Sequence, residues 1–155
     1  MILSLALALA IATPAPSAAP MTPRQIQVRR ASTHVMPFSL DRSMHAFEPT
    51  PQGGTMTVHT HANDPGQIEL IRAHLRGEAL AFARGDYADP ASIHGSSMPG
   101  LAELRAGHAS VTVRYAAVPD GAEISFVSKS PALIAALHRW FAAQVADHGH
   151  DAMMM

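Results

Sequence analysis

The sequence predicts an α+β fold in which an antiparallel sheet of two β-hairpins is covered on one face by two helices, in the order ββαββα. Residues 55–61 and 110–115 alternate between apolar and polar side chains, and residues 43–48 and 122–127 are expected to be the strands that pair with them. Alternation with a period of two is typical of half-buried strands. After each pair of strands, apolar residues recur at helical spacing and would bury one stripe against the sheet.

The first hairpin is expected to turn at Gly53-Gly54, since glycine permits the positive φ of a tight turn. The helix that follows begins at Asp64-Pro65, where aspartate can cap the helix and proline suits its first position. The apolar stripe of this helix consists of Ile68, Ile71, Leu75, Ala79 and Phe82.

The second half repeats this plan after a loop at 89–100 and a short helix at 101–106. Its hairpin turns at residues 119–121, and Ser130-Pro131 opens the last helix. The buried side of that helix consists of Leu133, Leu137, Trp140, Phe141 and Gln144.

Residues 1–19 read as a secretory signal peptide, because a short apolar run precedes two prolines and a group of small residues. The run is too short to span a bilayer, and no Lys or Arg precedes it. The alternative is an apolar helix docked on the domain.

We expect a periplasmic or secreted protein with no stable membrane span after cleavage. Its expected parts are a flexible lead over 20–33 with a short edge strand at 25–29, a single α+β domain over 34–149, and a His/Met tail over 150–155.

Composition excludes several functions. The chain has no cysteine, so disulfides and thiolate chemistry are excluded. Lys plus Arg total 11 and Asp plus Glu total 12, and this balance argues against nucleic acid as a partner. The sequence is compatible with a homodimer. The unusual residue types are histidine, with 10 copies, and methionine, with 9.

The sequence carries no recognised catalytic signature. It lacks a G-x-S-x-G elbow, an H-E-x-x-H helix and a glycine-rich phosphate loop. A Ser–His–Asp triad stays open, because its members need not be close in sequence. Catalysis is therefore less expected than binding.

Histidine and methionine provide the candidate chemistry, because imidazole and thioether together suit copper and thioether favours Cu(I). His94 and Met98 form the preferred pair, since they lie in a loop bounded by glycine and proline. His74 and Glu78 share a helix face. The predicted metal ligands are His34, Met36, His45, His74, His94, Met98 and His148. Haem and zinc are the alternatives to copper.

Each candidate also has a structural interpretation. Met36 suits a core side chain, and His148 suits a cation at a helix C-terminus. His59 and His61 suit the solvent face of an edge strand, together with the threonines that alternate with them.

Several motifs are distributed over residues 34–151: HVMPFSLDRSMHAF at 34–47, QIELIRAHL at 67–75, IHGSSMPGL at 93–101, ALHRWF at 136–141 and DHG at 147–149. They resemble a family of small exported bacterial proteins, members of which are sometimes named aspartate carbamoyltransferase, and the resemblance covers most of this range. The Ser-Thr-Arg-Thr motif of carbamoyltransferases is absent, since the chain has only Ser32-Thr33-His34. The resemblance implies export and gives weight to the histidines in the matching stretches: His34, His45, His74, His94, His138 and His148.

Three functions follow, and each predicts a different arrangement. A metal-binding module predicts that His45, His74, His94 and Met98 converge. An envelope interaction or stress protein predicts dispersed structural histidines and an exposed apolar patch. An enzyme with a His–carboxylate pair predicts that the pair lines one concave pocket.

Overall fold

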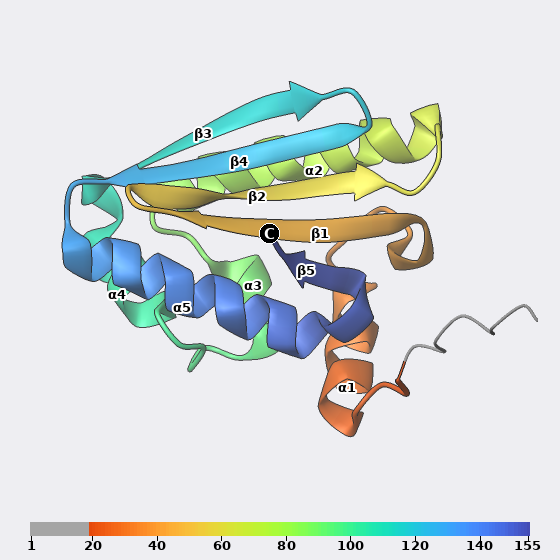
Figure 1. Cartoon of the computed structure of the whole chain (residues 1–155), viewed down its shortest axis with the longest axis horizontal. Helices are drawn as coiled ribbons and strands as arrows, with labels where there is room; N and C mark the ends of the chain where they lie inside the picture. The colour runs from red at the N-terminus through yellow and green to blue at the C-terminus, as the bar shows by residue number, and fades with distance from the viewer. Residues whose placement is uncertain (1–18) are drawn as a thin grey trace, which may run out of the picture.

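A computed structural model describes residues 19–155 (Figure 1). Apart from Ala19, the predicted signal peptide lies outside these residues. The helices are α1 (Pro23–Ser32), α2 (Pro65–Ala83), α3 (Ala88–His94), α4 (Leu101–Gly107) and α5 (Pro131–His148). The strands are β1 (Ser43–Thr50), β2 (Gly53–Thr60), β3 (Val111–Val118), β4 (Gly121–Ser128) and β5 (Ala152–Met154). Short 3₁₀ turns are η1 (Leu40–Arg42), η2 (His108–Ser110) and η3 (Gly149–Asp151).

The strands form one sheet in the order β3-β4-β2-β1-β5. The two predicted hairpins are present and join through β2 and β4. The α+β class is confirmed, but the purely antiparallel ββαββα plan is wrong, because β5 pairs with β1 in parallel. The chain leaves α5 through Gly149, whose φ of 59° lies in the left-handed region that favours glycine, and then returns along β1.

The first hairpin does not turn at its two glycines. Thr50 pairs with Gly53, so the turn is Pro51-Gln52 and both glycines lie in β2. Gly53 has φ 150°, and a Cβ there would lie 1.9 Å from the carbonyl oxygen of Phe126. The glycine is therefore required by the close approach of β2 and β4.

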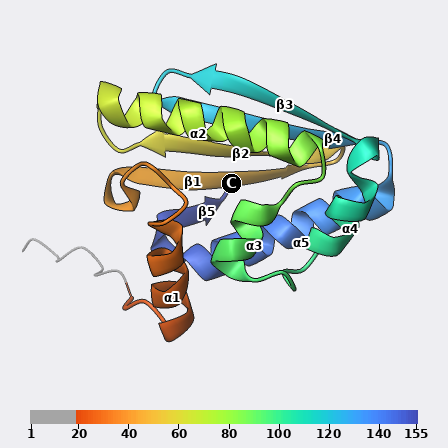
Figure 2. The ribbon, with the colours of Figure 1, turned by 180° about the vertical axis from the view of Figure 1, so that it is seen from behind.

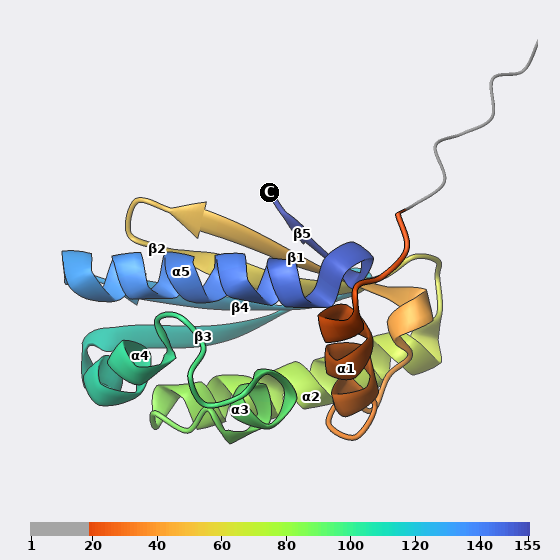
Figure 3. The same ribbon diagram turned by 90° about the horizontal axis from the view of Figure 1, so that it is seen from below.

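Both long helices pack on the same face of the sheet. Phe126 of β4 contacts Phe82 of α2, with ring centroids 5.9 Å apart. It also contacts Trp140 and Phe141 of α5 at 6.0 and 5.9 Å. The predicted apolar stripes of both helices are buried in this core. Figure 2 shows α3 and α4 beside α5, and Figure 3 shows the helices along the sheet.

Most of residues 20–33, expected as a flexible lead with an edge strand, lie in the helix α1, which spans Pro23–Ser32. Thr22 and Gln25 make a reciprocal capping box, and Pro23 occupies the first turn. Val28 is the only buried apolar residue that α1 contributes within the described chain. The helix is tied to the rest of the protein by charged and amide side chains, chiefly the pairs Arg24–Asp147 and Arg29–Asp151.

Two further segments are more ordered than expected. The loop predicted at 89–100 contains most of α3, and the His/Met tail at 150–155 supplies part of η3 and all of β5. None of the helices within residues 19–155 has both the length and the hydropathy needed to cross a membrane.

Candidate functional site

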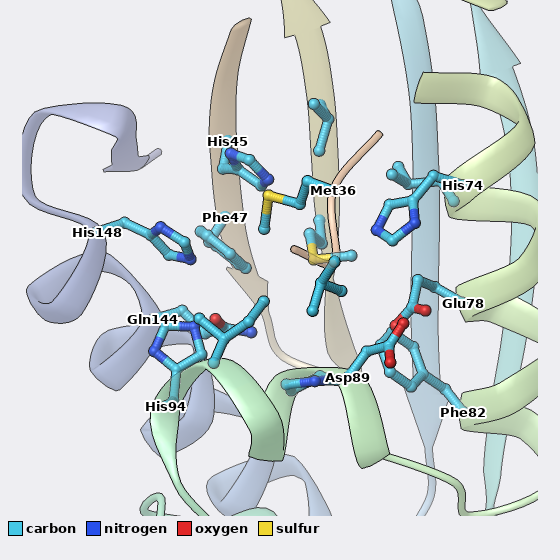
Figure 4. A pocket seen from close by; sticks show the side chains of 16 residues that line it. Met36, His45, Phe47, His74, Glu78, Phe82, Asp89, His94, Gln144 and His148 are labelled. Atoms are coloured by element: carbon cyan, nitrogen blue, oxygen red, sulfur yellow. The ribbon is translucent and has the colours of Figure 1, made fainter. Parts of the chain in front are cut away.

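A cavity of about 40 Å³ lies between the sheet and the helices α2, α3 and α5 (Figure 4). Since a water molecule needs roughly 10–15 Å³ by this measure, the cavity has room for about three waters. Most of its wall is apolar, and the polar side chains gather at two ends. The apolar and thioether side chains that line it are Val35, Met36, Phe47, Met56, Val58, Leu75, Phe82, Pro90 and Ile93.

Three histidines form one end of the cavity, and each comes from a different element (Figure 4). His45 lies on β1, His94 ends α3 and His148 ends α5. The rings of His45 and His148 are stacked, with centroids 5.3 Å apart. The ring of His94 meets His148 edge-on at 4.8 Å. The exposed fractions are only 4%, 6% and 2% for His45, His94 and His148, so all three imidazoles are removed from solvent.

Burial keeps His45 and His148 neutral. It lowers the pKa of His45 to about 4, an effect that the backbone of Asp151 offsets only in part. It lowers the pKa of His148 to about 2, and the neighbouring His45 and His94 act in the same direction. Within residues 19–155, the Nδ1 atom of neither ring has a hydrogen-bond partner. A buried polar atom without a partner costs about 1–3 kcal/mol, so this end of the cavity is suited to a ligand that satisfies both nitrogens.

His94 is held by a carboxylate. Its Nδ1 lies 2.9 Å from Oδ2 of Asp147, and burial outweighs this contact so that the pKa of His94 is lowered. Arg24 binds both oxygens of Asp147 at 2.5 and 3.0 Å and also donates to the carbonyl of His94 at 2.8 Å. These partners lower the pKa of Asp147 despite its partial burial. An ionised Asp147 can only accept, so a neutral His94 carries its proton on Nδ1 and the lone pair on Nε2.

The opposite end contains His74 and Glu78 of α2 and Asp89 of α3 (Figure 4). Burial, followed by a hydrogen bond to Asp89, raises the pKa of Glu78 to about 8. Burial lowers the pKa of His74, whose ring packs edge-on against Phe38 at 5.7 Å. Near neutral pH, Glu78 is thus mainly protonated and His74 is neutral.

Met36 follows α1 in the chain and points into the cavity on the side of His45 (Figure 4). Its side chain is half-buried and packs against the core. The two interpretations of Met36, core side chain and ligand, are therefore compatible, because the same residue packs against the core and lines the cavity.

Five of the seven predicted ligands line the cavity. His45, His94, His148 and Met36 lie toward one end and His74 lies at the other, so the predicted convergence does not include His74. The remaining two lie elsewhere: Met98 is buried and lines a separate surface groove, and His34 is exposed.

Other histidines have structural positions. His138 contacts the carbonyl oxygens of Thr50 and Gly53 at the end of the first hairpin. His59 alternates with the buried Val58 and Thr60 and is half-exposed on the outer face of the sheet, while His61 is exposed.

Sequence reasoning missed Asp147 and Arg24, the partners of His94. They are 123 residues apart, so no local pattern connects them.

Among residues 19–155, no three His, Asp or Glu side chains have the spacing of a preformed metal site. Comparison with protein-family models, curated proteins and solved structures finds no match to this chain.

Proposed function

We propose that the protein binds a copper ion, preferentially Cu(I), through the imidazoles of His45, His94 and His148 with the thioether of Met36. The observation that carries this proposal is the meeting of three buried imidazoles in one cavity, two of them with unpartnered Nδ1 atoms. Neutral imidazole is the form that binds metals, and burial maintains it here.

The ring spacing supports this assignment. Two imidazoles that bind one ion through nitrogen at about 2.0 Å, in tetrahedral geometry, have centroids about 5 Å apart. The observed separations are 5.3 Å for His45–His148 and 4.8 Å for His94–His148. Binding then requires mainly rotation of the rings, so that their nitrogens face a common point. The Asp147 carboxylate behind His94 is the usual outer partner of a metal-binding histidine.

The charge of the site favours a monovalent ion. The proposed ligands are all neutral, and Glu78 at the far end is mainly protonated at neutral pH. The cost of burying an ion without compensating charge rises steeply with its charge, so a divalent ion is disfavoured. Thioether ligation adds a preference for Cu(I) over zinc. The small cavity also favours an ion over haem.

Competition titration of the apoprotein with Cu(I), buffered by a chromophoric chelator, tests the proposal. We expect a Kd well below micromolar and a weakening of at least about tenfold in His148→Gln, since loss of an outer partner of a metal ligand alone costs about 10- to 100-fold. His59→Gln, on the outer face, is the matched control and should bind like the wild type. A wild-type Kd above micromolar, or equal losses in both variants, would contradict the proposal.

Export to the periplasm or beyond is part of the proposal. It rests on the apolar N-terminal sequence and on the use of His and Met in a chain without cysteine. Fractionation of cells that express the full chain should place the processed protein outside the cytoplasm. Recovery of unprocessed protein from the cytoplasm would contradict export while leaving the metal site untouched.

A second candidate function is acid–base catalysis, favoured by the His94–Asp147 hydrogen bond and the protonated Glu78 across the cavity. His94 would act as the base and Glu78 as the acid. A screen of substrates with about three or four heavy atoms, the size that this cavity accepts, such as methyl formate, tests this: turnover should disappear in His94→Asn and persist in His59→Gln. Turnover that survives His94→Asn would exclude this role.

A further inference from the structure

A surface groove of about 330 Å³ borders His94, which also lines the cavity. Arg24, Met98, Ala143 and Asp147 contribute to the wall of the groove. The side chain of His94 is 1% exposed. His94 is therefore the residue that the two spaces share.

Met98 holds a fixed place in this groove. It is 7% exposed, and the loop that carries it is bounded by Gly95 and Gly100, with φ values of 90° and 82°. A Cβ at Gly100 would lie 2.0 Å from the carbonyl oxygen of Ala136, so the loop is docked tightly on α5. A thioether four residues from His94 is thus presented at the groove without being a wall of the inner cavity.

We propose that the groove is the entry site for Cu(I), with the Met98 thioether as first ligand and His94 as the ligand shared with the inner site. This inference rests on the proposed function. The groove is lined by a residue with the soft sulfur donor that Cu(I) prefers, and His94 lines both the groove and the cavity. Met98 then affects the rate of loading and has little effect on the final affinity.

The Arg24–Asp147 pair holds the ring of His94 in place. Arg24 is 44% exposed at its side chain and comes from α1, whose contacts are mainly polar. Rotation of the His94 ring requires its hydrogen bond with Asp147 to break. Removing the Arg24 guanidinium loosens this arrangement and should speed both loading and release of the ion.

Stopped-flow transfer of Cu(I) from its bicinchoninate complex to the full folded protein tests the entry site. We expect Met98→Leu to slow transfer about tenfold while the Kd changes less than twofold. Met153→Leu is the matched control, because Met153 is exposed on β5, and it should load like the wild type. Leucine conserves the volume of methionine, so both variants should fold.

The outcomes separate the two proposals. A wild type that takes up no Cu(I) overturns the proposed function and the entry site together. A wild type that binds Cu(I) while Met98→Leu loads at the same rate overturns the entry site alone. A Met98→Leu Kd that weakens in step with the rate also overturns it, because Met98 would then be a ligand of the final site.

A second measurement does not depend on rates. Ag(I), a d¹⁰ substitute for Cu(I), added in excess so that the inner site is already filled, should shift the Met98 methyl signal in a spectrum of methyl-labelled methionine, and Met98→Leu identifies that signal. An unmoved Met98 signal while Ag(I) binds elsewhere would overturn the entry site.

Discussion

Replacing Glu78 with glutamine should stabilise the apoprotein, and the gain should grow with pH. Burial and Asp89 raise the pKa of Glu78 from 4.5 to about 8, so the folded chain binds a proton there that the unfolded chain releases. The stability due to this proton is fully present below pH 4.5 and is lost as the pH rises through 8. Glutamine keeps the shape of the neutral acid and cannot ionise.

The size of the gain follows from the two pKa values. A pKa difference of one corresponds to about 1.4 kcal/mol. The free energy of unfolding of Glu78→Gln should therefore exceed that of the wild type by about 3 kcal/mol at pH 7 and by about 1 kcal/mol at pH 5.

Urea denaturation at pH 5, 6, 7 and 8 measures this difference. Glu69→Gln is the matched control, because Glu69 is an exposed residue of the same helix, and it should change stability by less than about 0.5 kcal/mol at every pH. A Glu78→Gln effect that is the same at pH 5 and pH 8, or that destabilises at pH 8, would refute the assignment of a protonated Glu78.

Three further predictions concern other features. In the Glu78→Gln variant, acidification from pH 8 to pH 5 should lower the free energy of unfolding by about 2 kcal/mol for each of His45 and His148. The reason is that these two histidines take up protons near pH 6.5 in the unfolded chain and stay neutral in the folded chain. Urea midpoints that do not fall would contradict their neutrality. Gly53→Ala should cost at least about 3 kcal/mol, since its Cβ would overlap the carbonyl of Phe126, and a thermal midpoint within about 2 °C of the wild type would contradict this packing. Amide exchange in α1 should accelerate in 1 M salt more than exchange in α5, because ion pairs hold α1 and salt screens them; equal effects would count against that description.

Secondary structure was most predictable where apolar residues repeat with the period of a strand or a helix because one face of that element is buried. Alternation along β1 to β4 and the apolar stripes of α2 and α5 were predictable, because each pattern faces one common core. The helix α1 was missed because its composition is polar and it buries a single apolar residue, Val28. The sequence does contain the capping box of α1, Thr22 and Gln25, but the neighbouring prolines favoured the interpretation as a flexible lead.

Features that depend on distant partners were not predictable. The three residues of β5 form a strand only because the edge of β1 is available to them. His45, His94 and His148 were each a candidate, but local spacing placed none of them beside another. Met98 was predicted because it lies four residues from His94 in one loop, but that loop is docked on α5 and Met98 lines the surface groove and not the cavity.

X-ray absorption of the Cu(I)-loaded protein tests the proposed ligand set most directly. The structure predicts scattering from two or three imidazole nitrogens at about 2.0 Å and one sulfur at about 2.3 Å. In His45→Gln and His148→Gln the imidazole contribution should fall, and in Met36→Leu the sulfur contribution should disappear. A spectrum with sulfur ligands alone, or one that these three substitutions leave unchanged, would contradict a copper site in this cavity.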